Sequence, residues 1–463
     1  MLQQENIHLK LRIEELEKEK AQLQAQIKFL SQKLFGMRSE KTAHKSPSAT
    51  KPSDDTSTRE IKFQSVSPKR RGARKGHQGH GRKIPKNLRV IERVHELPPD
   101  QRYCKICGKS FRELAISDDS NEVDYEEEIV LIKHCRKKYE KTCSCPGPKI
   151  IATPQPPKLI PKGGFSTNFL VKVLMDKYLF QIPLNRQAYR IRLSGLFIWR
   201  STLTGAIRAV SNYLVPLYEA LADESRQAHH WHADETRWRV FIEKEGKKSY
   251  LWWLWVFASE HVIFYTIDPS RSGRVPRNHL GDDASGILNA DRYSAYKTLD
   301  QNIQVAYCWS YVRRDFIGIQ TRYPDHKQLY QWAGQWIERI NELFAINRLR
   351  LQSLDAPVEF ERHQTQLIEA LDAIKTDSQK DYPHWEQNKA MKSLREHWSG
   401  LTIFVHYPQV PMDNNQAERC LRLPVVGRNN YYGNHSESGG LLTAVMFTIL
   451  QTCVHNQLKP DAY

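Results

Sequence analysis

Three acidic residues occupy positions from which folding could bring their side chains together. Asp234 lies in the middle of a predicted strand, and Asp291 follows directly after another strand. Aspartate is uncommon in strands, so at these places it often has a role beyond packing. Glu418 belongs to a predicted helix, which we expect Asp413 to cap and Pro424 to end, with Glu418 in the second turn. Each acid taken singly is equally consistent with a surface salt bridge.

Carboxylates that folding brings together repel one another unless cations neutralise them. Two Mg²⁺ or Mn²⁺ ions about 4 Å apart would do so, one activating the attacking oxygen of a phosphodiester displacement and the other stabilising the leaving oxygen. Asp234, Asp291 and Glu418 are therefore candidate ligands of a two-metal site that acts on nucleic acid. Arg419 and Arg422 follow the third acid in sequence and are candidates for holding phosphate.

The elements that would position these acids begin at residue 229, where strand patterns replace helical ones. Alternating and aromatic-rich segments predict strands, and a helical stretch is expected near residues 274–280. The predicted strands are residues 230–240, 249–259, 261–267, 286–290 and 303–309. The order strand, strand, strand, helix, strand, helix, strand is that of a ribonuclease-H-like domain.

Two tight cysteine clusters indicate a small metal-binding unit within residues 100–150. The predicted structural Zn²⁺ ligands are Cys104, Cys107, Cys143 and Cys145. Gly108 after the first pair suits the turn of a zinc knuckle, whereas the second pair is closer than usual, so His134 or Cys135 could replace a ligand. Residues 121–139 between the clusters are expected to form a strand pair. Free thiols are the alternative reading.

The N-terminal segment, residues 2–34, has leucine at every seventh position, at Leu9, Leu16, Leu23 and Leu30. This seam, flanked by Glu, Lys and Gln, predicts a coiled coil and hence a homo-oligomer. A single amphipathic helix packed on its own protein is the alternative. Residues 42–67 are rich in Ser, Thr, Pro, Lys and Asp and resemble a flexible linker.

A basic strip interleaved with glycines, residues 68–83, follows the linker and contains no acid. Its candidate DNA-binding residues are Arg70, Arg71, Arg74, Lys75, Arg82 and Lys83. Such a strip can follow a phosphate backbone or lie in a minor groove, although a solvated basic linker has the same composition. The whole chain carries 69 Lys and Arg against 52 Asp and Glu, a net charge of +17, which points to a polyanionic partner.

A membrane is the less favoured polyanion because no run of about 18 apolar residues is evident. The polar N-terminus does not resemble a secretory signal, and clustered cysteines fit a reducing compartment. We therefore expect a cytoplasmic, nucleoid-associated protein. Residues 160–222 are helical by pattern, with a helix starting near Pro183, a glycine turn at Gly195 and a second helix capped by Ser201. This order fits a helix-turn-helix, and equally an ordinary helical hairpin.

Four strings resemble motifs of the insertion sequence 66 family of bacterial transposases. They are His-Ala-Asp-Glu-Thr at 232–236, Ala-Asp-Arg-Tyr-Ser-Ala-Tyr at 290–296, Cys-Trp-Ser-Tyr-Val-Arg-Arg at 308–314 and Asp-Asn-Asn-Gln-Ala-Glu-Arg at 413–419. The resemblance extends upstream to residues 34–41, the basic strip and the cysteines, and downstream to residues 427–430 and the final Asp-Ala-Tyr. It implies a DDE catalytic core with Asp234, Asp291 and Glu418 as the triad, and a helical insertion before the last acid.

Two features depart from the family pattern. Tyr311 stands where the family usually has His, and the chain ends at Tyr463, earlier than its relatives tend to. Either feature is compatible with reduced activity or with tolerated drift. The expected function is strand cleavage at transposon ends followed by transfer of the 3′-hydroxyl to target DNA, with possible helper proteins from the same element. The alternatives are a catalytically inactive, DNA-binding relative that acts as a regulator, and a zinc-dependent transcription regulator, which would leave residues 229–435 unexplained.

The expected fold class is a multidomain α+β protein. Its predicted parts are a coiled coil (1–41), a basic linker (42–99), a zinc-binding domain (100–150), a helical, helix-turn-helix-like region (160–222), a ribonuclease-H-like core (226–320 and 402–450) and a helical insertion (321–401).

Overall fold

The computed structural model describes residues 127–140, 150–243, 249–299 and 301–462, together with residues 98–99, 106–107, 109–110 and 142. The chain divides into two compact units, one of residues 39–128 and one that contains residues 129–463. The predicted coiled coil, the six basic residues of the strip, and Cys104, Cys143 and Cys145 lie outside the described residues. Cys107 is described, and it is exposed and not in a disulfide.

A five-stranded mixed sheet forms the centre of the larger unit, with strand order β5-β4-β3-β6-β7. The strands are β3 (His230–Arg239), β4 (Leu251–Ala258), β5 (Ile263–Asp268), β6 (Gly286–Ala290) and β7 (Ile303–Tyr307). β3, β4 and β5 run antiparallel, whereas β6 and β7 are parallel to β3. All five predicted strands are confirmed, and the mixed sheet with its helices is consistent with a ribonuclease-H-like domain.

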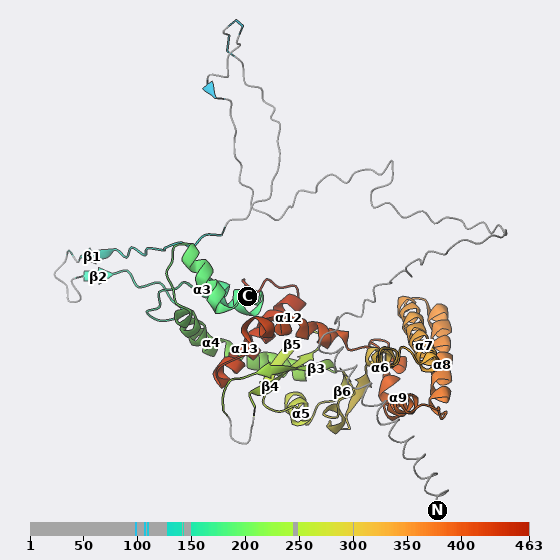
Figure 1. Ribbon diagram of the computed structural model, residues 1–463. Coiled ribbons are helices and arrows are strands. Elements are labelled where there is room, and N and C mark those ends of the chain that lie inside the picture. Colours follow the sequence, from blue (N-terminus) through green and yellow to red (C-terminus); the bar gives the residue numbers. More distant parts are fainter. Residues whose placement is uncertain are drawn as a thin grey trace, which may run out of the picture. The chain divides into compact units, whose positions relative to one another are not determined.

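The two faces of the sheet carry different helices because successive side chains of a strand point to opposite sides. On one face, Trp238 and Val240 share a core with α12 (Asn415–Tyr431) and α13 (Glu437–His455). On the other face, Trp231 and Ala233 pack with α5 (Arg274–Leu280), as predicted for that helix. We refer to these as the α12 face and the α5 face (Figure 1).

Three helices precede the sheet: α2 (Thr167–Tyr178), α3 (Leu184–Leu193) and α4 (Arg200–Arg226). They join the core of the α12 face through residues such as Leu170, Ile191 and Leu203. The predicted helix, glycine turn and second helix are present, and Gly195 has the positive φ of 92° that favours glycine. The predicted Ser201 cap is wrong, because α4 begins at Arg200 without a side-chain cap.

A helical insertion with its own core separates β7 from α12. It consists of α6 (Trp309–Arg322), α7 (Lys327–Gln352), α8 (Pro357–Ser378) and α9 (Trp385–Glu396), followed by the single-turn helices α10 (Trp398–Leu401) and α11 (Ile403–His406). Apolar side chains at helical spacing on α7, including Leu329, Trp336 and Leu343, are buried against α6 and α8. The predicted helical character of this stretch is confirmed.

Two expectations from the sequence need correction. Within the described part of residues 121–139, the chain is irregular up to Lys137, and β1 (Lys138–Glu140) pairs instead with β2 (Ile150–Ala152), since a strand forms where its backbone finds a partner. In addition, α13 is long and apolar enough to cross a bilayer by length and composition. However, 67% of its apolar stretch is buried inside the protein, so we assign it as a core helix.

Candidate active site

Strand pairing sets Asp234 and Asp291 level with each other. β3 and β6 are parallel neighbours, and His232 pairs with Asn289 in their register. Continued by two residues, the same register places Asp291, immediately after β6, beside Asp234 in β3. Both aspartates share the α12 face with His232 and Asn289, because side chains two apart in a strand point to the same side.

The segment before α12 is fastened to β3 by the side chain of Asn414, which is fully buried. Its Nδ2 donates to the carbonyl of Ala233 at 2.7 Å, and its Oδ1 lies 3.1 Å from Nδ1 of His232. Because Oδ1 can only accept, His232 carries its proton on Nδ1. The backbone amide of Asn414 also donates a hydrogen bond to Sγ of Cys308, at 3.3 Å. Asn414 therefore connects α12, β3 and the residue after β7.

A second asparagine, Asn289 in β6, holds the same segment from the neighbouring strand. Its Nδ2 donates to the carbonyls of Pro411 and Asp413, at 2.9 and 3.2 Å, while its Oδ1 lies 2.7 Å from Nε2 of His230. Buried backbone carbonyls require such partners, so both contacts fix the approach of the chain to α12. As a result, Glu418 in the first turn of α12 is close enough to Asp234 for its charge to raise the pKa of Asp234.

The site concentrates negative charge that the protein only partly compensates. The pKa of Asp234 is raised well above its usual value, first by burial and then by the neighbouring charges of Glu235, Asp291 and Glu418. Burial also raises the pKa of Asp291. His232 does not offset this charge, because burial lowers its pKa to about 3 and leaves the imidazole neutral. A bound cation would relieve both the desolvation and the repulsion.

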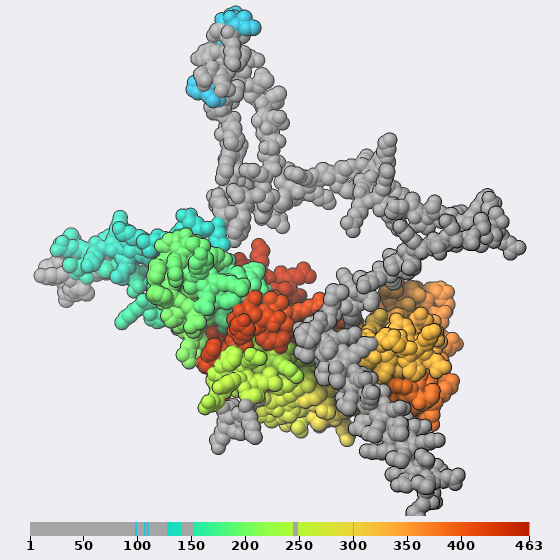
Figure 2. Space-filling model, in the orientation of Figure 1, coloured from blue at the N-terminus to red at the C-terminus, as the bar shows by residue number. Residues whose placement is uncertain are grey.

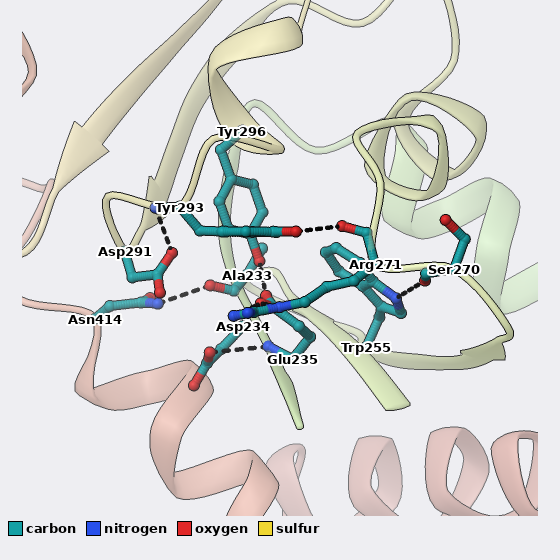
Figure 3. Close-up of polar contacts among 10 residues, drawn as sticks. All are labelled: Ala233, Asp234, Glu235, Trp255, Ser270, Arg271, Asp291, Tyr293, Tyr296 and Asn414. Carbon is teal, nitrogen blue, oxygen red and sulfur yellow. Dashed lines mark hydrogen bonds and ion pairs between the residues drawn. The ribbon is translucent and has the colours of Figure 1, made fainter. Parts of the chain in front are cut away.

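The carboxylates of the three acids are suitable ligands for a divalent cation, although in the structure they are not grouped around one point. Asp234 accepts from the Glu235 amide at 2.8 Å and Asp291 from the Tyr293 amide at 2.9 Å, so Figure 3 shows them directed to separate donors. Within the described ranges, no three His, Cys, Asp or Glu side chains are grouped to hold a metal ion. Oε1 of Glu418 is buried without a hydrogen-bond partner. Carboxylate oxygens of this kind are the ligands that Mg²⁺ and Mn²⁺ prefer.

Tyr311, in α6, faces the three acids. Its hydroxyl is within hydrogen-bonding reach of the Glu418 carboxylate, and burial together with the charges of Asp234 and Glu418 raises its pKa, so it remains a neutral donor. Arg314 lies over the Tyr311 ring at 4.6 Å and places Nη2 3.8 Å from Oε1 of Glu418. The two arginines proposed from the sequence to hold phosphate, Arg419 and Arg422, are exposed on α12.

Glu235, which was not among the candidate residues predicted from the sequence, forms a buried ionic cluster on the α5 face. Nε of Arg271 donates to Oε1 at 2.7 Å, and the Tyr296 hydroxyl donates to Oε2 at 2.7 Å. The Arg271 guanidinium stacks on the Tyr293 ring, 3.9 Å from its centroid, and the Tyr293 hydroxyl donates to the Arg271 carbonyl (Figure 3). The sequence signal that could have revealed this cluster is the string that follows Asp291, because it contains Tyr293 and Tyr296, two and five residues after the aspartate.

The start of α12 differs from the prediction. The N-cap is Asn414 rather than Asp413, and Glu418 lies in the first turn rather than the second. Asp413 instead accepts hydrogen bonds from the amide and the side chain of Asn415, at 3.2 and 2.5 Å. The helix starts later than predicted because Asn289 and Asn414 hold the preceding residues against the strands.

The end of α12 also differs, since Pro424 lies inside the helix and α12 continues to Tyr431. A proline within a helix leaves the carbonyl four residues earlier without its amide donor. Here that carbonyl belongs to Cys420, and it accepts a hydrogen bond from the Tyr265 hydroxyl at 2.8 Å. A tertiary contact from β5 thus supplies the donor that proline lacks.

A five-stranded mixed sheet with two acids level on adjacent strands, and a third acid on a helix over the same face, is consistent with a DDE-type domain. Residues 162–441 match the family described as "Transposase IS66 family". The chain belongs to that family. Membership implies a phosphoryl-transfer enzyme that binds DNA and takes part in transposition.

Relatives in Sinorhizobium fredii share the sequence over much of its length. One, named "Uncharacterized protein y4hP", is 27% identical in an alignment of 409 residues that covers 80% of this chain and 70% of the relative. Another, "Uncharacterized protein y4jD", is 25% identical in an alignment of 479 residues, gaps included, that covers 97% of this chain and 91% of the relative. No solved structure matches the chain.

Proposed function

We propose that this protein is an active DNA transposase with Asp234, Asp291 and Glu418 as its catalytic acids. In this proposal it cleaves a DNA strand at the transposon end and then directs the new 3′-hydroxyl onto target DNA. The observation that carries the proposal is that Asp234 in β3, Asp291 directly after β6 and Glu418 in α12 lie on the α12 face, near enough for the other two acids to raise the pKa of Asp234.

The three carboxylates would hold two Mg²⁺ or Mn²⁺ ions, which when bound supply activation of the attacking oxygen and stabilisation of the leaving oxygen. Two observations support this assignment: Oε1 of Glu418 is buried without a hydrogen-bond donor, and burial together with neighbouring carboxylates raises the pKa of Asp234. Asn414 acts as a positioning residue, since it fixes the start of α12 on β3 and thereby the place of Glu418.

Basic and hydroxyl groups around the acids suit a phosphodiester substrate. Arg314 and the exposed Arg419 and Arg422 would attract the DNA backbone and orient it across the site. Tyr311 would hold Glu418 in place through its hydroxyl, which burial and the surrounding charges keep protonated by raising its pKa. A tyrosine can hydrogen-bond a carboxylate as the histidine usual in the family can, so Tyr311 is compatible with an active site.

The remaining parts of the proposal concern residues outside those described. We propose that residues 2–34 associate two or more copies, that the cysteines bind one structural Zn²⁺ per chain, and that the strip at 68–83 contacts DNA. We also propose a bacterial, cytoplasmic location at the nucleoid, where the DNA substrate lies, and helper proteins of the same element as partners.

The decisive experiment measures Mg²⁺-dependent cleavage of DNA that carries the element's own ends. We expect the wild-type protein to nick the strand at the element end and Asp234→Asn to bind the same DNA without cutting it. Asp413→Ala is the matched control, because this acid is near the site but is engaged with Asn415, and it should retain cleavage. Binding without cleavage by wild type would instead support the inactive, regulatory relative, and recovery of cleavage by Tyr311→His would then identify Tyr311 as the cause.

A further inference from the structure

The segment that contains α3 and the first half of α4 carries positive charge only. No Asp or Glu lies between Asp176 and Glu219, whereas this interval contains five arginines and one lysine. Arg190 pairs with the buried Asp176, while Arg186, Arg192 and Arg200 are exposed. Such a surface attracts a polyanion and repels a second copy of itself.

The same segment exposes an unusual number of large apolar side chains. Tyr189, Leu193, Phe197 and Trp199 are 60%, 72%, 65% and 62% exposed. Clustered aromatics on a surface usually mark a binding site, because leaving them in water forgoes the free energy of burial. In the view of Figure 2 this segment, drawn in green, lies at the surface of the protein.

The turn between α3 and α4 holds two of these rings in a fixed arrangement without burying them. Ile198 is 5% exposed and anchors the turn in the core, so its neighbours Phe197 and Trp199 point outward. The two rings meet edge to face with centroids 5.4 Å apart, and the Arg192 guanidinium lies 4.7 Å above the Phe197 ring and 5.9 Å from Trp199. The arrangement is therefore preorganised, with a cation beside two exposed π-systems.

We propose that Phe197 and Trp199, together with Arg192, form a stacking site for an unpaired base of DNA, which we call the aromatic turn. Exposed aromatic rings stack on bases of any sequence, and the neighbouring arginines contact the adjoining phosphates. Duplex DNA keeps its bases stacked on one another, so the rings select a strand whose bases are unpaired, as at a cut or frayed end. The inference rests on the proposed function only in taking DNA as the polyanion.

The test uses the full-length protein without divalent metal, so that binding is measured and cleavage is not. The probes are two DNA molecules of equal length, one a blunt duplex and the other a duplex with a short single-stranded overhang that contains 2-aminopurine. We expect Phe197→Ala/Trp199→Ala to weaken binding of the overhang DNA about tenfold and to leave blunt-duplex affinity within about twofold. Wild type should quench the 2-aminopurine fluorescence, and the double variant should not.

Two control variants distinguish stacking from a general loss of structure. Phe197→Tyr/Trp199→Phe keeps both rings and should retain overhang binding and quenching. Trp385→Ala removes a 43% exposed tryptophan on α9 that also lies under a lysine, and it should have no effect. Equal loss on both DNAs, no loss on either, or a fall in oligomer mass for the alanine variant would each overturn the proposal. Asp234→Asn should bind the overhang DNA and quench 2-aminopurine as the wild type does. An error in the catalytic assignment can therefore be distinguished from an error in the assignment of the aromatic turn.

Discussion

Asp234 and Glu235 are neighbours in sequence, yet they lie on opposite faces of β3 in opposite electrostatic surroundings. On the α5 face, Glu235 is buried and both of its oxygens accept hydrogen bonds, from Arg271 and Tyr296. On the α12 face, Asp234 accepts from a backbone amide, and burial and the charges of Glu235, Asp291 and Glu418 raise its pKa. A buried charge that is paired contributes to the stability of the fold, whereas a buried carboxylate among other acids indicates a binding site for a cation.

The largest expected effect concerns the α12 face alone. Asp234→Asn, Asp291→Asn and Glu418→Gln should each lower the rate of single-turnover cleavage about 1000-fold, equivalent to about 4 kcal/mol of transition-state stabilisation. Because the three acids serve the same ions, double variants should be hardly slower than single ones. Full cleavage by Glu418→Gln would falsify the triad, and multiplicative losses would show that the acids act independently.

The second largest expected effect is on stabilisation by Mg²⁺, which should depend on the α12 face and not on the α5 face. Saturating Mg²⁺, at about 100 times its dissociation constant, should raise the free energy of unfolding of the wild type by about 2.7 kcal/mol for each ion bound. Asp234→Asn should abolish this increment, whereas Glu235→Gln should preserve it, because its partners lie on the α5 face. Chemical denaturation with and without Mg²⁺ measures both, and stabilisation that survives Asp234→Asn would place the ions elsewhere.

Stability without metal should show the reverse order. Glu235→Ala leaves the buried Tyr296 hydroxyl without its acceptor and should lower the free energy of unfolding by about 2 kcal/mol. Arg271 adds less to this loss, since its side chain is 37% exposed and can return to water. Asp234→Asn removes an uncompensated charge and should leave stability unchanged or raised. Urea midpoints of the two variants measure the difference, and equal destabilisation would remove the contrast between the faces.

The smallest effect is expected at Asp413. Its carboxylate lies near Glu418 but accepts hydrogen bonds from Asn415. Asp413→Ala should therefore lower the free energy of unfolding by about 1 kcal/mol or less and leave cleavage nearly intact. Asn414→Ala is the informative partner variant, because it removes the contact between α12 and β3 and should lower cleavage as well as stability. Similar cleavage by the two variants would show that Asn414 does not position Glu418.

Local patterns predicted much of this molecule. The five strands, α5, the helices around Gly195 and the helical character of the insertion follow from periodicity and turn residues, which are properties of short stretches of chain. Asp234 and Asp291 were recognisable for the same reason, since an aspartate inside or directly after a strand is unusual whatever lies around it. Glu418 stood out through the string at 413–419 in a predicted helix.

Only the tertiary structure decided which groups meet. The register of β3 with β6 sets Asp234 beside Asp291, and Asn414 and Asn289 bring α12 to both, through contacts between residues more than a hundred positions apart. Tyr265 lets α12 continue through Pro424 by the same kind of long-range contact. The sequence by itself therefore determined the acids and the elements that carry them. The fold decided that Glu235 pairs with Arg271 whereas the charges that act most on Asp234 are those of other acids, because charge compensation depends on distance in space.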